Sequence, residues 1–138
     1  IPCRGYEVER GSLMLRYGTA PFLECSSRGD KRFSAFVARI KIRENRTIEE
    51  LYQAFKIFSD GSSNLSWRDA KGRKPVNMDE CRQYYTALWD MYITENPELL
   101  SVIMQASGLS DMFGQEGHVC QAEELWRIKN TWITNASR

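Results

Sequence analysis

Thr47-Ile-Glu-Glu-Leu-Tyr-Gln-Ala-Phe-Lys-Ile-Phe58 is the clearest structural signal in this chain of 138 residues. Thr47 and Glu50 stand three residues apart, which is the spacing of a capping box, where each side chain accepts a hydrogen bond from the other residue's backbone N–H. A helix is therefore expected to begin at this threonine. Apolar side chains then recur at helical spacing and predict one buried stripe: Ile48, Leu51, Phe55 and Phe58.

A second face of the same predicted helix carries reactive groups. Glu49, Gln53 and Lys56 fall at i, i+4 and i+7, which aligns a carboxylate, an amide and an amine along the helix. Such a line is either an ordinary solvated face or the wall of a site, and spacing alone does not choose between them. Glu49 lies in the first turn, where the helix dipole favours an ionised carboxylate, and this placement is also explained by dipole complementarity without catalysis.

The rest of the chain predicts a fold in which helices outnumber strands. Runs rich in aromatic, aliphatic and β-branched residues predict strands at 12–17, 21–25 and 35–42. Capping residues and helical periodicity predict further helical segments at 67–71, 77–95, 96–107 and 121–131. We therefore expect an α+β fold, in which residues 1–138 form a mainly α-helical single domain with a small antiparallel sheet near the N-terminus.

Charge, cysteine spacing and the absence of familiar motifs restrict the function. The net charge is +1, but residues 1–46 hold ten Lys/Arg against five Asp/Glu, which indicates a basic N-terminal surface suited to phosphates. The four cysteines form no C-x-x-C pair, so we expect no metal, and simple hydrolysis needs no cofactor. The sequence has no P-loop, no G-x-G-x-x-G and no G-x-S-x-G motif.

The sequence is compatible with two compartments. No membrane-spanning run or signal peptide is visible, so no membrane partner is expected. A reduced, cytoplasmic compartment is the expectation. An even number of cysteines and three N-x-S/T tripeptides leave secretion as the alternative, and nothing in the sequence indicates an oligomeric state.

Four segments of the chain, taken in order, resemble the motifs of one known family. Phe33-Ser-Ala-Phe36 resembles its L/F-S-N-F segment, and residues 47–58 resemble its S-x-E-H-x-Y-Q-A-x-K-F helix. Residues 89–108 resemble a K-F-x-x-N-P-x-L stretch that ends in glycine, and Glu123-Glu-Leu-Trp126 resembles an acidic element before Trp-Gly. On these motifs the chain resembles the NADAR (YbiA-like) N-glycosidase superfamily over most of its length. It departs from the motifs, which have Asn, His and Gly, at three positions: Ala35, Glu50 and Arg127.

The resemblance implies cleavage of an N-glycosidic bond, and Glu49 and Lys56 are the candidate catalytic residues. Breaking a sugar–base bond builds positive charge on the sugar, which a carboxylate such as Glu49 stabilises while it deprotonates the attacking water. A partly desolvated amine such as Lys56 loses affinity for its proton and can form a Schiff base with the opened sugar. The family motif also has a lysine at this position. An exposed lysine at a helix end is the alternative interpretation.

Several other side chains are expected to bind substrate. Tyr52 and Gln53 can hydrogen-bond sugar hydroxyls, and Arg28 and Arg32, in a basic turn, suit a phosphate. Trp67 begins a second basic run and can stack on a base. The resemblance adds the matching motif positions as substrate-binding residues: Ser34, Phe36, Glu123 and Trp126. The alternatives are a solvated loop for the arginines and core packing for the tyrosine and the tryptophans.

The leading hypothesis is therefore an N-glycosidase-type hydrolase acting on a nucleotide, an ADP-ribosyl adduct or a modified nucleobase in nucleic acid. Two other hypotheses stay open: a DNA-modifying transferase that moves a group onto a base in the same pocket, and a non-catalytic nucleic-acid-binding module that uses the basic runs and exposed aromatic side chains. The position of Lys56 discriminates between them. A lysine enclosed with Glu49 favours an enzyme, and a lysine in bulk water favours the module.

Overall fold

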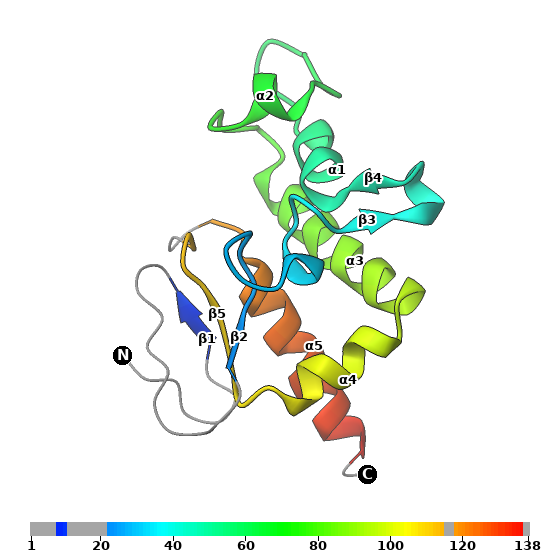
Figure 1. The fold of residues 1–138 in the computed structure, drawn as a ribbon. Helices are drawn as coiled ribbons and strands as arrows, with labels where there is room; N and C mark the ends of the chain where they lie inside the picture. The colour runs from blue at the N-terminus through cyan, green and yellow to red at the C-terminus, as the bar shows by residue number, and fades with distance from the viewer. Residues whose placement is uncertain (1–7, 11–21, 115–117, 137–138) are drawn as a thin grey trace.

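The computed structural model describes residues 8–10, 22–114 and 118–136 of the chain. Helices dominate this part of the chain and the strands are short, which confirms the predicted α+β class with a mainly helical content (Figure 1). The α-helices are α1 (Ile48–Phe55), α2 (Trp67–Ala70), α3 (Met78–Glu95), α4 (Glu98–Gln105) and α5 (Gln121–Ala136).

The larger of the two sheets is parallel. It contains β1 (Val8–Arg10), β5 (Gly108–Asp111) and β2 (Phe22–Glu24) in the spatial order β1-β5-β2, and β5 runs parallel to both neighbours. The small antiparallel element is a separate pair, β3 (Arg39–Ile40) with β4 (Arg46–Thr47). The antiparallel orientation expected from the sequence is therefore found in this pair. In the three-stranded sheet that expectation is wrong, because its strands run parallel. Parallel strands need a long crossover connection, and here α1 to α4 lie in the chain between β2 and β5.

The strand predictions fare differently along the chain. The segment at 21–25 contains β2, whereas the segment at 12–17 lies outside the described residues. The strand predicted at 35–42 is wrong except for β3, because the Ser34 carbonyl accepts hydrogen bonds from the N–H groups of Val37 and Ala38 and turns the chain. After β3 comes a 3-10 turn, η2 (Lys41–Arg43).

α1 begins as predicted and ends earlier. The Thr47 hydroxyl accepts from the Glu50 N–H at 3.1 Å, and Glu50 Oε1 accepts from the Thr47 N–H at 3.3 Å, which is the expected capping box. The helix stops at Phe55, whose ring is partly exposed and stacks on Tyr84 at a centroid distance of 4.3 Å. Phe58 is buried, but it lies beyond the helix. The predicted burial is therefore confirmed for every member of the stripe except Phe55, although the last member lies outside the helix.

α3 matches its predicted range, although its cap does not. The Asn77 side chain makes no cap bond to α3; instead its Oδ1 accepts from the Ile57 N–H at 2.9 Å and its Nδ2 donates to the Phe55 carbonyl at 3.0 Å. This amide thereby ties the end of α1 to the start of α3. Asn96 likewise ends α3 rather than capping α4, with Nδ2 donating to the Tyr92 carbonyl.

Between the last two helices, the chain forms a strand that the sequence does not predict. α4 ends at Gln105, and Gly108, expected to stop that helix, is the first residue of β5. α5 starts at Gln121 as predicted and continues to Ala136, past the expected end at Thr131. The four residues of β5 contain no β-branched side chain, so the usual strand signal is missing from this stretch.

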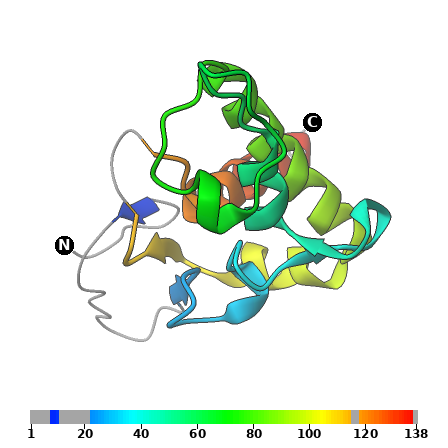
Figure 2. The same ribbon diagram turned by 90° about the horizontal axis from the view of Figure 1, so that it is seen from above.

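α3 lies between two halves of the molecule, one formed by α1, α2, β3 and β4 and the other by the parallel sheet, α4 and α5 (Figures 1 and 2). On one side it packs against α1, which also contacts α2, and on the other side it packs against α5. α5 covers the parallel sheet through contacts with β5 and β1. Residues from both halves share one hydrophobic core, whose fully buried large members include Phe33, Ile40, Ile48, Leu88, Trp89, Ile103, Leu109 and Leu125.

Candidate functional site

α1 holds Glu49 and Gln53 against each other. Gln53 Nε2 donates to Glu49 Oε1 at 2.8 Å, as expected for residues one helical turn apart. Glu49 is half-buried and Gln53 is buried. The Gln53 carbonyl oxygen Oε1 is also buried and has no hydrogen-bond partner within the described ranges. Buried amide oxygens are normally paired, so this oxygen is an unsatisfied acceptor beside Glu49.

Lys56 is enclosed, although it does not continue α1. It is the C-cap residue with extended backbone dihedrals, so the helical alignment expected at i+7 is not realised. Its side chain is nevertheless only 5% exposed, and Nζ donates to the carbonyls of Arg73 at 3.3 Å and Ala70 at 3.4 Å. Burial lowers the pKa of Lys56, while the negative charge of Glu49 acts to raise it. The Lys56 ammonium and the Glu49 carboxylate therefore interact electrostatically.

Two tyrosines fill the space beside these groups. The Lys56 ammonium lies 5.6 Å from the ring centroid of Tyr52, and Tyr52 meets Tyr85 of α3 edge to face at 5.2 Å. Burial raises the pKa of Tyr52 to about 12, with a further increase from Glu49. The pKa of Tyr85 is also raised, chiefly by burial and further by the charges of Glu49 and Glu124. Tyr52 thus lies beside Lys56 as a buried member of the core, which agrees with the alternative of core packing.

The Phe33–Phe36 segment connects the starts of α1 and α5. The Ala35 carbonyl accepts from the Glu49 N–H at 3.0 Å, and the Ala35 N–H donates to Gln121 Oε1 at 2.7 Å. Gln121 Nε2 reaches Asp111 Oδ2 at 3.2 Å, which continues the chain of contacts to the sheet. Gln121 was not expected from the sequence, because a single glutamine at a helix start carries no pattern.

Ser34 and Phe36 have opposite placements on either side of Ala35. Ser34 is fully buried, and its hydroxyl oxygen accepts from the Phe36 N–H at 3.3 Å, so its role in this structure is to shape the turn. Phe36 is half-exposed and meets Trp67, the first residue of α2, with ring centroids 6.4 Å apart in an edge-to-face arrangement. Of these two predicted substrate-binding residues, only Phe36 presents a side chain to the surface.

A cavity of about 260 Å³ lies between α3 and the start of α5. Glu123, predicted to bind substrate, lines it. The other lining residues are Arg82, Thr86, His118, Val119, Cys120 and Glu124. The cavity wall therefore brings cationic, acidic and imidazole groups together, and the sequence pointed only to Glu123 among them.

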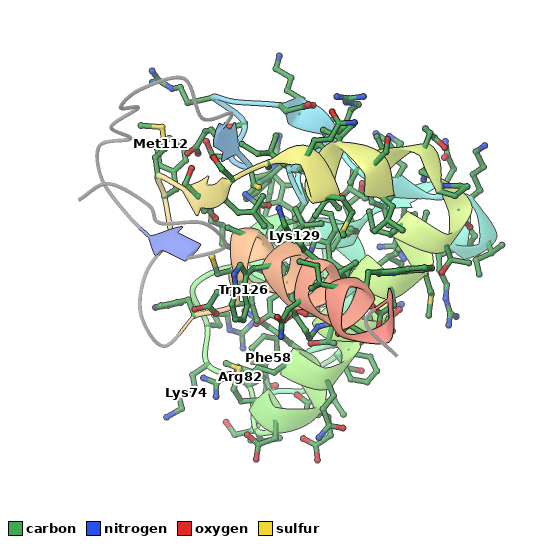
Figure 3. The ribbon with its side chains drawn as sticks, turned by 90° about the horizontal axis from the view of Figure 1, so that it is seen from below. Phe58, Lys74, Arg82, Met112, Trp126 and Lys129 are labelled. Carbon is green, nitrogen blue, oxygen red and sulfur yellow. The ribbon has the colours of Figure 1, made fainter. Side chains whose placement is uncertain are left out.

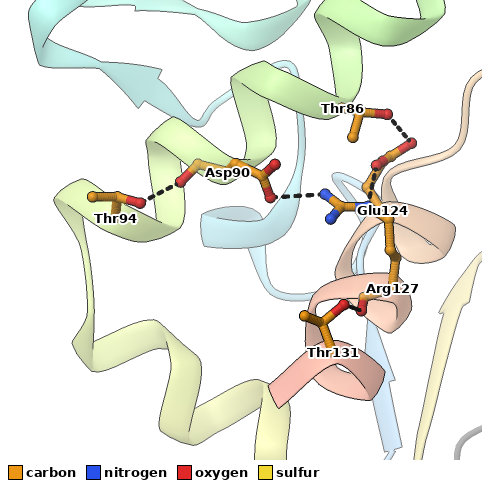
Figure 4. A network of polar contacts seen from close by, with 6 residues as sticks. All are labelled: Thr86, Asp90, Thr94, Glu124, Arg127 and Thr131. Atoms are coloured by element: carbon orange, nitrogen blue, oxygen red, sulfur yellow. Dashed lines mark hydrogen bonds and ion pairs between the residues drawn. The ribbon is translucent and has the colours of Figure 1, made fainter. Parts of the chain in front are cut away.

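Arg127 clamps α5 to α3 where the family motif has glycine. Its Nη2 lies 2.8 Å from Asp90 Oδ1 and its Nε lies 3.1 Å from Glu124 Oε1, while Thr86 Oγ1 donates to Glu124 Oε2 at 3.0 Å (Figure 4). This network fixes Glu124 at the cavity. Trp126, labelled in Figure 3, packs at the edge of the core, and its indole N–H is buried without a partner in the described part of the chain.

The basic turn does not offer both of its predicted phosphate ligands. Arg28 is exposed, but the Arg32 guanidinium is held by Asp30 through Nε at 3.0 Å and Nη2 at 2.7 Å. The same contact lowers the pKa of Asp30. The Arg32 carbonyl accepts from the Tyr92 hydroxyl at 2.6 Å, which anchors this turn on α3. The Arg32 guanidinium is therefore already paired with a carboxylate of the same turn, at the protein surface.

Over residues 8–10, 22–114 and 118–136, no group of three or more His, Cys, Asp or Glu side chains is arranged to hold a metal ion. In the same ranges, no helix combines the length and the apolar character that crossing a membrane requires. No model of a known protein family matches the chain, and a comparison with curated proteins found no match.

Proposed function

We propose that this protein is an N-glycosidase-type hydrolase acting on a nucleotide, an ADP-ribosyl adduct or a modified nucleobase. The observation that carries the proposal is the burial of the Lys56 ammonium within the electrostatic reach of Glu49. Lysine side chains are rarely buried, and a buried amine with a lowered pKa next to a carboxylate is a common arrangement in catalytic sites. A purely solvated helix face would leave this amine in water.

In this proposal Glu49 activates water. Its carboxylate takes a proton from the water molecule while the water oxygen attacks the anomeric carbon of the sugar. The bond from that carbon to the base nitrogen breaks, and the base leaves with the electron pair and is then protonated. The negative charge of Glu49 also stabilises the positive charge that develops on the sugar. The hydrogen bond from Gln53 Nε2 fixes the carboxylate in one orientation.

Lys56 has a second role in the same proposal. When neutral, its amine attacks the aldehyde carbon of a ring-opened sugar, and loss of water gives a Schiff base that a second water later hydrolyses. The lowered pKa of Lys56 increases the fraction of neutral amine near physiological pH. The Tyr52 ring and the surrounding backbone keep the amine away from bulk solvent.

The test is a comparison of two matched glutamate variants. Glu49→Gln is expected to reduce turnover of nucleosides, nucleotides or ADP-ribosylated substrates by about 10³-fold, because it removes the general base. Glu80→Gln is the control, since Glu80 is an exposed acidic residue in the first turn of another helix, α3. Mass spectrometry of the products separates hydrolysis from transfer to an acceptor. Full turnover by the Glu49→Gln protein would refute the assigned role.

A non-catalytic nucleic-acid-binding module is the second candidate function. It is favoured by one observation, the exposed basic run after Trp67, which comprises Arg68, Lys71, Arg73 and Lys74. Such a module would bind nucleic acid with a strong dependence on salt and release no product. The activity assay and a binding assay at several salt concentrations distinguish the two candidates.

A further inference from the structure

Phe36, which is exposed, and Trp67, which is half-buried, form an aromatic pair at the surface, which we call the aromatic platform. The rings meet edge to face at 6.4 Å, and Phe36 is 49% exposed. The Lys71 ammonium lies 5.6 Å from the Phe36 centroid and 5.5 Å from the Trp67 centroid, and the Arg68 guanidinium lies 5.7 Å from the Trp67 centroid. An aromatic ring at the surface bordered by cations is the combination that binds unpaired bases and their phosphates.

The aromatic platform is joined to both ends of α1. At the start of the helix, the Glu49 N–H donates to the carbonyl of Ala35, the residue before Phe36. At its end, Lys56 Nζ donates to the carbonyl of Ala70, the residue before Lys71. Hydrogen bonds to the residues that precede Phe36 and Lys71 therefore join the platform to the helix that carries Glu49 and ends at Lys56.

The cations beside the platform extend along the chain rather than converging on one point. Residues 67–74 hold Arg68, Lys71, Arg73 and Lys74 against a single acid, Asp69, and all four cations are exposed. The Arg73 guanidinium lies 3.9 Å from the Phe58 centroid and is 3.9 Å from Asp60 Oδ2, a loose surface contact. Sites for free nucleotides enclose most of the ligand surface. An open platform with a spread of cations fits a chain of phosphates better.

We propose that the aromatic platform and the basic run at residues 68–74 bind single-stranded nucleic acid, so that the substrate of the site is a base within such a strand. This inference rests on the proposed N-glycosidase function for the identity of the reaction, and on the platform alone for the binding. One unpaired base stacks on Phe36 and Trp67, and the cations hold the neighbouring phosphates. A base inside a duplex cannot stack in this way, because both of its faces are covered by its neighbours.

The experiment measures binding of a fluorescent single-stranded DNA of about 12 nucleotides, within the usual site size of single-strand-binding surfaces. The Glu49→Gln protein is used, so that turnover cannot remove the probe. Trp67→Ala and Phe36→Ala are each expected to weaken binding by about tenfold, the loss of one stacking partner. Lys71→Gln leaves the rings in place and is expected to reduce the salt dependence by about one phosphate contact. Trp132→Ala, at an exposed tryptophan on α5, is the matched control and is expected to leave binding unchanged.

Three results would overturn the inference: duplex DNA of the same sequence binding as tightly as the single strand, AMP or ADP-ribose competing as well as an unlabelled oligonucleotide, or Trp67→Ala behaving like Trp132→Ala. Failure of the proposed function gives a different pattern. In that case the oligonucleotide binds as expected, and Glu49→Gln hydrolyses substrates as fast as the parent protein. If instead the parent protein cleaves free nucleosides and the oligonucleotide does not bind, the reaction stands and the platform is excluded.

Discussion

Lys56 and Lys129 are two buried lysines in opposite halves of the molecule. Their side chains are 5% and 1% exposed, and both ammonium groups donate to backbone carbonyls. Burial lowers the pKa of each. Lys129, labelled in Figure 3, reaches the carbonyls of Met104 and Ala106 at the end of α4, where helical carbonyls lack partners within the helix.

The difference lies in what surrounds each amine. Lys129 donates hydrogen bonds to backbone carbonyls at the end of α4, and these contacts join α5 to α4. Lys56 lies over the Tyr52 ring and within the field of Glu49, and its two hydrogen bonds to carbonyls are long. Burial and a lowered pKa are therefore shared by a structural lysine and a candidate catalytic one. The charge of the Glu49 carboxylate acts on Lys56 and is the feature that distinguishes it from Lys129.

Replacing Lys56 is expected to give the largest effect. Lys56→Met keeps most of the side-chain volume and removes the amine, so turnover should fall by about 10³-fold if the amine takes part in the chemistry. Stability should change little, because only two weak hydrogen bonds are lost. Single-turnover kinetics and urea unfolding of the same preparation measure both quantities. A variant that turns over normally would make Lys56 a second structural lysine.

Replacing Lys129 is expected to do the reverse. Lys129→Met leaves the carbonyls of Met104 and Ala106 buried without this donor, which should lower the free energy of unfolding by about 2 kcal/mol. Turnover should be retained by the folded fraction, because Lys129 lies on the α4–α5 side of the molecule. Urea unfolding measures the stability. An equally stable variant would show that these carbonyls find other partners.

The field of Glu49 can be tested without any substrate. Glu49→Gln removes a negative charge that raises the pKa of Lys56, so the pKa of Lys56 should fall further below its ordinary value of 10.5. The pKa of Lys129 should not move. NMR titration of ¹³C-labelled lysine side chains reports both residues in one sample. An unchanged pKa of Lys56 would mean that Glu49 and Lys56 do not interact.

The lowered pKa of Lys56 also makes its contribution to stability depend on pH. Because the folded-state pKa of Lys56 lies below the unfolded value, the unfolded chain binds more protons between the two values, and stability rises with pH across that window. Glu49→Gln lowers the folded-state pKa of Lys56 further, so this window extends to lower pH. The Lys56 contribution, taken as the difference between the parent and Lys56→Met in urea unfolding, should therefore begin to rise at a lower pH in the Glu49→Gln background. If the rise begins at the same pH in both backgrounds, the pKa shift attributed to Glu49 is refuted.

The half of the molecule around Lys56 could largely be predicted from the sequence. The capping box and the range of α3, which borders this half, depend on residues close together in the chain, so local patterns identify them. The placement of Glu49 against Gln53 follows from helical spacing alone. Burial of Lys56 could not be read this way, because it depends on carbonyls 14 and 17 residues further along the chain.

The half around Lys129 was less predictable for the same reason. β5 is a strand because it pairs with β1 and β2, segments more than eighty residues away, and its own sequence has little strand character. The role of Gln121 depends on the meeting of three segments at Ala35 and Asp111. Long-range pairing leaves no local pattern, so the parallel sheet and this part of the candidate site required coordinates.

The smallest expected effect concerns α1 alone. Thr47→Ala removes the hydroxyl of the capping box and should destabilise the helix by about 1 kcal/mol. Because helices can open locally, backbone amides of α1 should exchange with solvent faster, while those of α5 around Lys129 keep their protection. Thr131→Ala is the matched control, since Thr131 Oγ1 only donates to the Arg127 carbonyl within α5. Native-state hydrogen exchange followed by NMR resolves the two helices. Equal acceleration in α1 and α5 would mean that both halves open as one unit, and the separate treatment of the two lysines would then lose its structural basis.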